Sequence, residues 1–414
     1  MKEIIYKERS VIMKVEITRL NHNGEGVGQI NGKIIFVPKT LPGDIVEATT
    51  VEDHKNFIRG VPTKFYQKSN VRIPSNCPYF NECGGCQFLE LPYQEQLKYK
   101  KEKVINILKK YANLDVNPTI KESKQYHYRN KITLQVQNGK IGLFSTKTNN
   151  LVPIKSCLLI SDAMNQLIEL IQSEINLQEI TGIIIKEAQS NIMVQLIGKT
   201  NEQNLIKILS PEVTSLYLNE KCLFGTKYIK EKLGDYEFQV SPASFFQVNH
   251  EQTINLYNQV KIYLGPNNNH VLDLYCGTGS IGIYVSDCCK KITGIELNSS
   301  AVKDANQNVL KNNLSHVKVY EGDVGKILKT KNTYDAIIVD PPRSGLDKRT
   351  KQVLKQIKCP KIIYVSCNPI TLARDLNDLK EIYDLKDISL FDMFPNTYHV
   401  ESVVLLELKD SGNS

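Results

Sequence analysis

Six short apolar runs alternate regularly with helical segments after residue 241, and they constrain the fold more than any other feature of the chain. They occupy residues 271–275, 291–296, 317–322, 334–340, 361–366 and 402–408, with helical segments between them. Continuous apolar strands that alternate with helices are typical of a mostly parallel sheet covered on both faces. We therefore predict an α/β domain with a mostly parallel sheet over residues 241–414.

The first part of the chain has a different pattern. Residues 14–69 contain five short β segments separated by turn signals at 21–24, 31–32 and 41–44, and the Asn31-Gly32 pair is a strong hairpin signal. Five strands in so short a stretch predict a small closed β-barrel of the oligonucleotide-binding (OB) kind, preceded by an N-terminal extension at residues 1–13. The alternative is a barrel that only braces the rest of the chain.

A third pattern fills residues 70–240, for which we predict a central α+β domain. Residues 70–90 are loop-like and rich in cysteine, and short strands alternate with helices from about residue 120. Residues 91–111 have apolar positions at helical spacing beside four lysines, Lys98, Lys100, Lys101 and Lys103. We expect an amphipathic helix there, with a basic face, that packs on the last domain.

Charge and hydropathy limit the partners and the compartment. The formal net charge is +8, and residues 1–131 hold all of the excess, with 22 Lys and Arg against 14 Asp and Glu. Such a basic region favours a polyanionic partner, most often nucleic acid, over an ordinary solvated surface. No apolar run approaches the length of a membrane span and residues 1–10 do not resemble a signal peptide, so we expect a cytoplasmic protein without disulfides.

The first strand of the last domain leads into a glycine-rich turn. Asp273 precedes Gly277 and Gly279, and the next strand ends in Glu296, 19 residues after Gly277. Glycines let a backbone approach a ligand closely, and a carboxylate at the end of the second strand can accept both hydroxyls of a ribose. This spacing favours a nucleoside-containing cofactor, while a dinucleotide site and a simple tight turn remain alternatives.

Three later strands also end in groups that can carry chemistry, and a fourth begins after one. Asp323 and Asp340 follow two of them, and Cys367 follows the strand 361–366. The carboxyl ends of parallel strands meet in one crevice, so a thiol there can act as a nucleophile. Glu401, beside apolar neighbours, is the candidate base, since burial raises the pKa of a carboxyl, and His399 is its substitute.

Three cysteines stand close together at Cys77, Cys83 and Cys86, with Gly84 and Gly85 among them, and Cys157 follows 71 residues after Cys86. Three clustered thiols and a distant one match four-thiolate ligation of a metal centre. We favour the interpretation that these cysteines bind an iron-sulfur cluster. A zinc site and the absence of any metal are the alternatives. The other five cysteines show no such grouping.

With these motifs the chain resembles the RNA uracil-C5 methyltransferases, which have a Rossmann-like class I fold and use S-adenosylmethionine. In particular, it resembles the 23S ribosomal RNA branch with an N-terminal TRAM barrel. The resemblance covers nearly the whole chain from about residue 14 and implies Cys367 as nucleophile and Glu401 as base. It also implies a [4Fe-4S] cluster on Cys77, Cys83, Cys86 and Cys157. The donor-binding positions that it implies are Gln247, Tyr275, Gly277, Ser280, Glu296, Asp323 and Asp340.

Several functions remain open at this point. The leading hypothesis is methylation of a flipped uridine in 23S ribosomal RNA through a covalent Cys367 adduct, by a monomeric enzyme. The basic helix, residues 126–131 and the barrel would then bind the RNA. Alternatives are transfer RNA as substrate, cytosine-C5 methylation, and a non-catalytic iron-sulfur protein that binds RNA.

Overall fold

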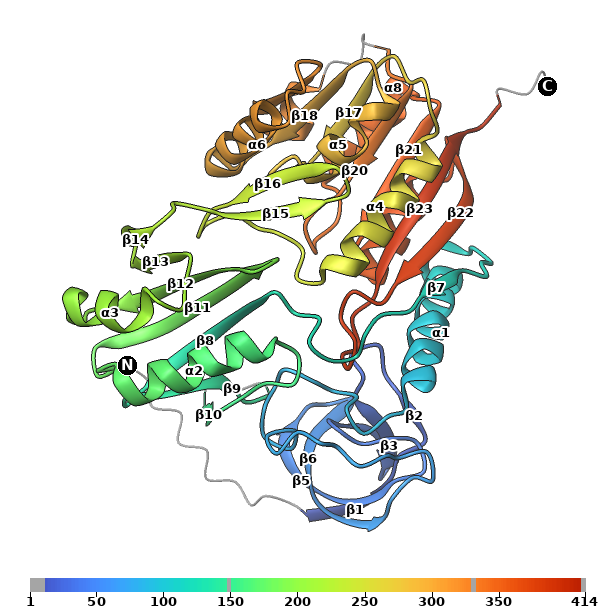
Figure 1. Cartoon of the computed structure of the whole chain (residues 1–414). Coiled ribbons are helices and arrows are strands. Elements are labelled where there is room, and N and C mark those ends of the chain that lie inside the picture. The colour runs from blue at the N-terminus through green and yellow to red at the C-terminus, as the bar shows by residue number, and fades with distance from the viewer. Residues whose placement is uncertain (1–11, 147–149, 329–332, 411–414) are drawn as a thin grey trace. The chain divides into compact units, whose positions relative to one another are not determined.

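The computed structural model describes residues 12–146, 150–328 and 333–410 (Figure 1). Most of the extension expected at residues 1–13 therefore lies outside the described residues. The chain divides into two compact units. Unit 1 comprises residues 1–99, 144–152 and 396–398, and unit 2 comprises residues 100–143, 153–395 and 399–414.

Unit 1 is built on a six-stranded sheet that curls around a small apolar core (Figure 1). Its strands are β1 (Ile12–Glu16), β2 (Arg19–Leu20), β3 (Gly26–Ile30), β4 (Lys33–Val37), β5 (Ile45–Asp53) and β6 (Phe57–Gln67), in the order β1-β5-β6-β4-β3-β2. Five strands were expected, and the first of them is in fact broken. The backbone N–H of Ile17 donates to Asp44 and that of Thr18 to Val27, so these two residues leave the β1 ladder and turn the chain into β2.

The cysteine-rich segment of unit 1 contains no helix and no named strand between residues 70 and 90, as the sequence indicates. Backbone hydrogen bonds hold it in place. The Gly84 N–H donates to Phe144 O, and the N–H groups of Gln87 and Phe88 both donate to Asn396 O. Arg72 pairs with Asp44 and Glu90, so ionic contacts tie the start of this segment to its end.

The central region has a seven-stranded sheet in the order β10-β9-β8-β11-β12-β13-β14. Its strands are β8 (Lys131–Gln137), β9 (Lys140–Phe144), β10 (Leu151–Pro153), β11 (Ile180–Ala188), β12 (Asn191–Gly198), β13 (Ser215–Leu218) and β14 (Lys221–Gly225), with helices α2 (Asp162–Glu174) and α3 (Glu202–Leu209). Both helices begin with a side-chain N-cap, Ser161 for α2 and Asn201 for α3. A separate hairpin, β15 (Ile229–Leu233) and β16 (Tyr236–Val240), leads to the last sheet.

The last sheet has eight strands in the order β19-β18-β17-β20-β21-β23-β22-β7 (Figure 1). These are β17 (Val271–Leu274), β18 (Ile292–Glu296), β19 (Val317–Glu321), β20 (Ala336–Val339), β21 (Lys361–Ser366), β22 (Tyr383–Phe391), β23 (Glu401–Leu408) and β7 (Thr119–Lys121). The pairs from β19 to β21 are parallel, and β23 runs antiparallel to both β21 and β22. The mixed α/β fold with a Rossmann-like C-terminal sheet is therefore confirmed.

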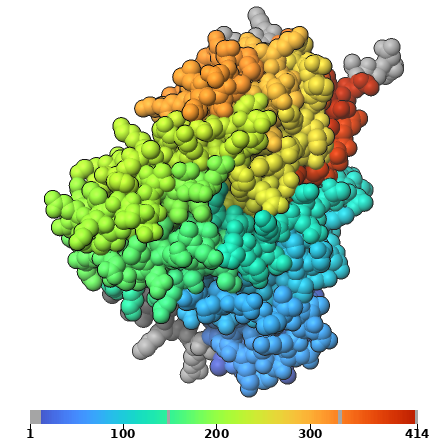
Figure 2. Space-filling model, in the orientation of Figure 1, coloured from blue at the N-terminus to red at the C-terminus, as the bar shows by residue number. Residues whose placement is uncertain are grey.

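Alternate residues of these strands point to opposite faces, and helices cover both. Leu272 and Leu274 face a core formed with α1 (Tyr93–Ala112), α7 (Val324–Ile327), α8 (Lys348–Ile357) and α9 (Pro369–Leu379). Val271 faces a second core formed with α4 (His250–Leu264), α5 (Ser280–Tyr284) and α6 (Ser299–Lys311). Figure 2 shows α4, in yellow, at the surface, where its residue Ile262 is 69% exposed.

The basic face expected on α1 is smaller than the sequence predicts. Lys100 does not belong to a solvent-facing basic surface of α1, because its side chain is completely buried and donates to Asp392 and to Phe394 O. The second half of α1 instead packs through Val104 and Leu108 into the first of the two cores. Within the described ranges, no helix is long and apolar enough to cross a membrane.

Candidate functional site

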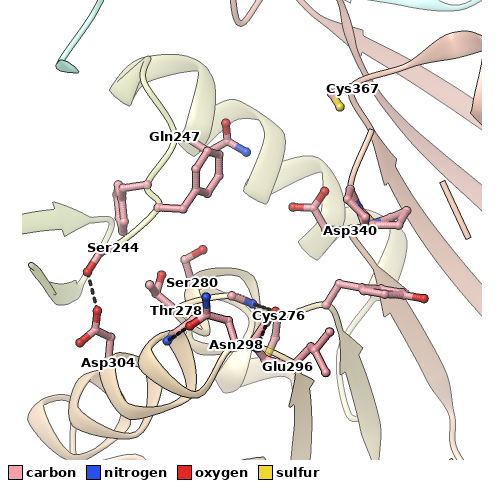
Figure 3. Close-up of a pocket in the computed structure, with 18 of the residues that line it drawn as sticks. Ser244, Gln247, Cys276, Thr278, Ser280, Glu296, Asn298, Asp304, Asp340 and Cys367 are labelled. Carbon is pink, nitrogen blue, oxygen red and sulfur yellow. Dashed lines mark hydrogen bonds between the residues drawn. The ribbon is translucent and has the colours of Figure 1, made fainter. Parts of the chain in front are cut away.

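A cavity of about 790 Å³ lies at the carboxyl ends of β17, β18, β20 and β21, entirely within unit 2. All nine predicted catalytic and donor-binding residues line it: Gln247, Tyr275, Gly277, Ser280, Glu296, Asp323, Asp340, Cys367 and Glu401. In Figure 3, Gln247 and Asp340 face each other across the open space, with Cys367 at one end and Glu296 at the other. A cavity of this size suits a ligand as large as a nucleoside cofactor.

The floor of the cavity is the turn between β17 and α5. Tyr275, Gly277 and Gly279 all adopt positive φ angles, of 61°, 53° and 74°. The glycines meet no strain there, whereas a residue with a Cβ would. The N–H of Gly277 donates to Glu296 Oε2 over 3.0 Å, and the N–H of Asn298 donates to Oε1 over 2.8 Å. The Glu296 carboxylate is thus held at the end of β18, beside the turn.

Below the turn, Asp273 is buried and ties β17 to α5. Its Oδ2 accepts the N–H of Gly282 over 2.9 Å, while its Oδ1 has no hydrogen-bond partner. Burial raises the pKa of Asp273 to about 7, and the Gly282 N–H opposes that shift. This residue therefore serves the shape of the turn, since it does not line the cavity itself.

Other predicted donor positions are fixed by their neighbours. The Ser280 hydroxyl shares a hydrogen bond of 2.7 Å with the buried Tyr257 on α4. The Tyr275 hydroxyl lies 3.1 Å from Thr350 Oγ1 on α8. Asp323 is the N-cap residue of α7, and its carboxylate lies 3.4 Å from Lys326. Sequence reasoning missed Tyr257, because a tyrosine on an amphipathic helix carries no signal of a polar contact.

The candidate nucleophile and base lie side by side at the far end of the cavity. Strands β21 and β23 are antiparallel, with Ser366 opposite Ser402, so Cys367 after the first strand lies across from Glu401 at the start of the second. Asp340 follows the neighbouring strand β20, and Arg343 lines the same cavity. The structure therefore brings together four groups from three separate parts of the sequence, since only Asp340 and Arg343 are close along the chain.

The electrostatics of this group follow from burial. Burial, with smaller contributions from Glu401 and Asp340, raises the pKa of Cys367 to about 11, and Arg343 opposes the rise. Burial also raises the pKa of Asp340 to about 7. Burial, with Asp340 second, raises the pKa of Glu401 to about 8, again against Arg343. At neutral pH this end of the cavity holds a thiol and a largely protonated carboxyl.

His399, the substitute base, has the opposite environment. Burial lowers the pKa of His399 to about 3, and the charges of Arg343, Lys103, Lys100 and Arg129 lower it further. Its Nδ1 lies 3.5 Å from Arg343 Nη2, and its ring contacts Phe394. The imidazole is therefore neutral across the physiological range and a weak proton acceptor.

Three of the candidate metal ligands belong to unit 1 and the fourth belongs to unit 2. In unit 1, Cys77, Cys83 and Cys86 are half-buried and close enough to the Lys39 ammonium to affect its pKa, and this ammonium donates to the carbonyl groups of Phe80 and Cys83. In unit 2, the backbone of Cys157 is held by Asn165 through two hydrogen bonds of 2.8 and 3.1 Å. Among the described residues, no group of three or more His, Cys, Asp or Glu side chains has the spacing of a metal site. The metal centre thus stays a prediction.

Comparison with known proteins identifies the family to which the chain belongs. The chain matches the families described as tRNA (Uracil-5-)-methyltransferase over residues 323–409, methyltransferase small domain over residues 256–359 and TRAM domain over residues 8–63. An uncharacterized RNA methyltransferase of Aquifex aeolicus is 34% identical over 421 residues, which cover 96% of this chain and 99% of the relative. Another, from Halalkalibacterium halodurans, is 31% identical over 446 residues, with 96% and 97% covered.

A solved structure is similar over the same extent. It is the crystal structure of the Pyrococcus abyssi tRNA (uracil-54, C5)-methyltransferase in complex with S-adenosyl-L-homocysteine, with a TM-score of 0.80 and 29% identity. The match covers 95% of this chain and 99% of that one. The resemblance inferred from the motifs is thereby confirmed at the level of the family. The chain belongs to the tRNA (uracil-5-)-methyltransferase family of RNA methyltransferases and carries a TRAM domain.

Proposed function

We propose that this protein transfers a methyl group from S-adenosylmethionine to C5 of a uridine in RNA. The observation that carries the proposal is the position of Cys367 across from Glu401 at one end of a cavity whose other end is the glycine turn with Glu296. One end can hold a methyl donor while the other offers a nucleophile and a base to a uracil ring.

The donor end fits a nucleoside. Glu296 offers carboxylate oxygens to ribose hydroxyls, and Gly277, which lines the cavity, has no side chain to block the approach of a ligand to the turn. The residues proposed to bind the donor are Gln247, Tyr275, Gly277, Ser280, Glu296, Asp323 and Asp340. When bound, the sulfonium supplies an electrophilic methyl group.

At the other end, Cys367 supplies the electrons that C5 of uracil lacks. Addition of its sulfur at C6 places a negative charge on the ring as an enolate, so C5 becomes nucleophilic and can take the methyl group. Formation of the thiolate is costly, because burial raises the pKa of Cys367 to about 11. The Arg343 cation acts in the favourable direction and stabilises the thiolate.

Glu401 then removes the proton from C5, so that the C6–S bond breaks and the Cys367 thiolate leaves. A base works best when its pKa lies near the working pH, and the pKa of Glu401 is raised to about 8. His399 is the poorer candidate, since the pKa of its ring is lowered to about 3.

Two substitutions test this chemistry on an RNA transcript. Glu401→Gln keeps the nucleophile and removes the base, so a covalent protein–RNA species should accumulate and survive denaturing electrophoresis. Cys367→Ala should form no such species and no 5-methyluridine. Methylation by the Cys367→Ala protein would overturn the mechanism, and an absence of methyl transfer by the unaltered protein would favour a non-catalytic RNA-binding protein.

For the substrate we propose 23S ribosomal RNA, on the combination of a TRAM domain with the four-cysteine pattern. Transfer RNA is the second candidate, because the similar Pyrococcus abyssi enzyme acts on uracil 54 of tRNA. Methyl transfer to protein-free 23S fragments and to bulk tRNA separates the two. Efficient methylation of tRNA with 23S RNA inert would reject the first candidate.

We also propose a [4Fe-4S] cluster on Cys77, Cys83, Cys86 and Cys157. Its support is the spacing of the four thiols and the Lys39 ammonium beside three of them, since a cation stabilises thiolates. Anaerobically purified protein should carry about four iron and four sulfide per chain. Stoichiometric zinc without acid-labile sulfide would reject the cluster.

A further inference from the structure

Residues 241–247 belong to the connection 241–249 between β16 and α4, and Ala243 to Gln247 form one wall of the cavity. We call residues 241–247 the donor loop, because most of them line the part of the cavity proposed to hold the methyl donor. The loop has no regular secondary structure. Gln247 in it points into the open space (Figure 3). An irregular loop can hold a ligand-binding residue only if other parts of the molecule fix its backbone.

On one side, the loop is held by a lysine of the central sheet. Lys186 on β11 is only 5% exposed, and its ammonium donates to the carbonyl oxygens of Ser241, Pro242 and Ser244 over 2.9, 2.8 and 3.0 Å. An ammonium group has three N–H groups, and all three of those on Lys186 form hydrogen bonds to this loop. Burial lowers the pKa of Lys186 to about 7, but three carbonyl acceptors need all three N–H groups of the protonated form, so the loop carbonyls receive charge-assisted hydrogen bonds.

On the other side, the loop is held by a carboxylate of the last domain. Asp304 on α6 accepts hydrogen bonds from the hydroxyls of Ser241 and Ser244 over 3.0 and 2.5 Å (Figure 3 shows the second). The Ser244 hydroxyl also accepts the N–H of Ser241 over 2.9 Å. The same two serines are thus fixed through their carbonyls by Lys186 and through their hydroxyls by Asp304.

An apolar contact completes the attachment. Phe246 packs against Phe238 with ring centroids 5.7 Å apart and contacts an apolar cluster that includes Met193 of the central sheet. Its neighbour Phe245 is 69% exposed and lines the cavity. The anchored side chains of Ser244 and Phe246 thus hold the backbone on both sides of Phe245 and directly before Gln247.

From this geometry we infer that Lys186 is a positioning residue for the methyl donor. Together with Asp304 it fixes the donor loop, so that the central domain contributes to donor affinity without touching the donor. The inference rests on the proposed function, since it takes the ligand of the cavity to be S-adenosylmethionine. Sequence reasoning did not single out Lys186, because a lysine within an apolar strand resembles an ordinary edge or solvent-facing residue.

The test uses the full-length Lys186→Met protein, which keeps the length of the side chain and removes its three donors. Affinity for S-adenosylhomocysteine, measured by calorimetry, should fall about tenfold, because the ligand then binds only the fraction of molecules in which the released loop is ordered. KM for the donor should rise by a similar factor while kcat changes less. Hydrogen exchange should accelerate in peptides from residues 241–249 and stay unchanged in β11.

Lys207→Met, an exposed lysine on α3, is the matched control and should leave all three measurements unchanged. Asp304→Asn weakens the hydrogen bonds to Ser241 and Ser244 on the other side of the loop and should produce the same pattern. It serves as the test if Lys186→Met fails to fold. Donor affinity within twofold of the unaltered protein, in a folded variant of either kind, would overturn the inference. If the unaltered protein binds no donor, the proposed function fails instead, and the exchange of residues 241–249 still tests the loop.

Discussion

Replacing Glu401 with Gln should make the protein more stable while it destroys turnover. Glu401 is 5% exposed, and its pKa is raised to about 8 from an ordinary value of 4.5. A folded-state pKa above the unfolded value means that the native state favours the protonated carboxyl. The stabilisation of the native state by the protonated carboxyl is fully present below pH 4.5 and is lost as the pH rises towards 8. A glutamine has the same shape and no charge, so it removes that loss.

The size of the effect follows from the pKa shift. A shift of about 3.5 pH units corresponds to about 5 kcal/mol of free energy of unfolding at high pH. Because titration is gradual, the difference between Glu401→Gln and the unaltered protein should be about 1 kcal/mol at pH 5 and about 3 kcal/mol at pH 7. Above pH 8 it should level off near about 5 kcal/mol.

Urea unfolding followed by far-ultraviolet circular dichroism at pH 5, 7 and 9 measures these differences. Glu407→Gln, on the same strand and only half-buried, is the control for removing a carboxylate without removing a buried one. A Glu401→Gln protein that is less stable than the unaltered protein, or whose gain is equal at pH 5 and pH 9, would show that Glu401 is not held in a desolvated site.

In the unaltered protein, kcat/KM should rise with pH up to about 8, because Glu401 accepts a proton only when ionised, and a profile flat from pH 6 to 9 would contradict this. Lys100→Met should cost about 3–5 kcal/mol in urea unfolding, since it leaves the buried Asp392 carboxylate uncompensated, and adding Asp392→Leu should restore most of it. Tyr257→Phe should raise KM for the donor several-fold through Ser280 and lower stability by about 1 kcal/mol. Lys98→Ala, at an exposed lysine of α1, should lower RNA affinity and reduce the slope of log K against log salt by about 1, and an unchanged slope would remove that residue from the RNA contacts.

The elements that the sequence predicts well are those whose side chains face an apolar core. The strands at 271–274 and 361–366 are buried on both faces, so their sequences are uninterrupted apolar runs. By contrast, β22 lies near the edge of the sheet, with only the short β7 on its outer side. It contains Asp384, Lys386 and Asp387, so it has no continuous apolar run, and the sequence does not predict a strand there. The break at Ile17 depends on a backbone contact with residue 44, which no local pattern records.

The site was predictable to the extent that it follows from strand ends. Asp340, Cys367 and Glu401 each adjoin a strand of one sheet, and the rule that such ends meet at one edge brings them together. The supporting contacts were not predictable. Lys186 and Asp304 lie in different parts of the chain, and only the folded structure shows that both bind the same two serines.

The protonation states of Cys367 and Glu401 also determine the order of events that the proposed reaction needs. The pKa of Glu401, about 8, lies below that of Cys367, about 11, so the first proton to leave as pH rises is that of the carboxyl. A carboxylate beside the thiol then opposes the formation of a thiolate. As the sulfur adds to C6, the thiol proton therefore passes to the ring oxygen O4, where the enolate charge develops, rather than to Glu401, and the Arg343 cation stabilises the negative charge on the sulfur. If Glu401 kept that proton, it could not take the one from C5, and the adduct would persist as it should in Glu401→Gln.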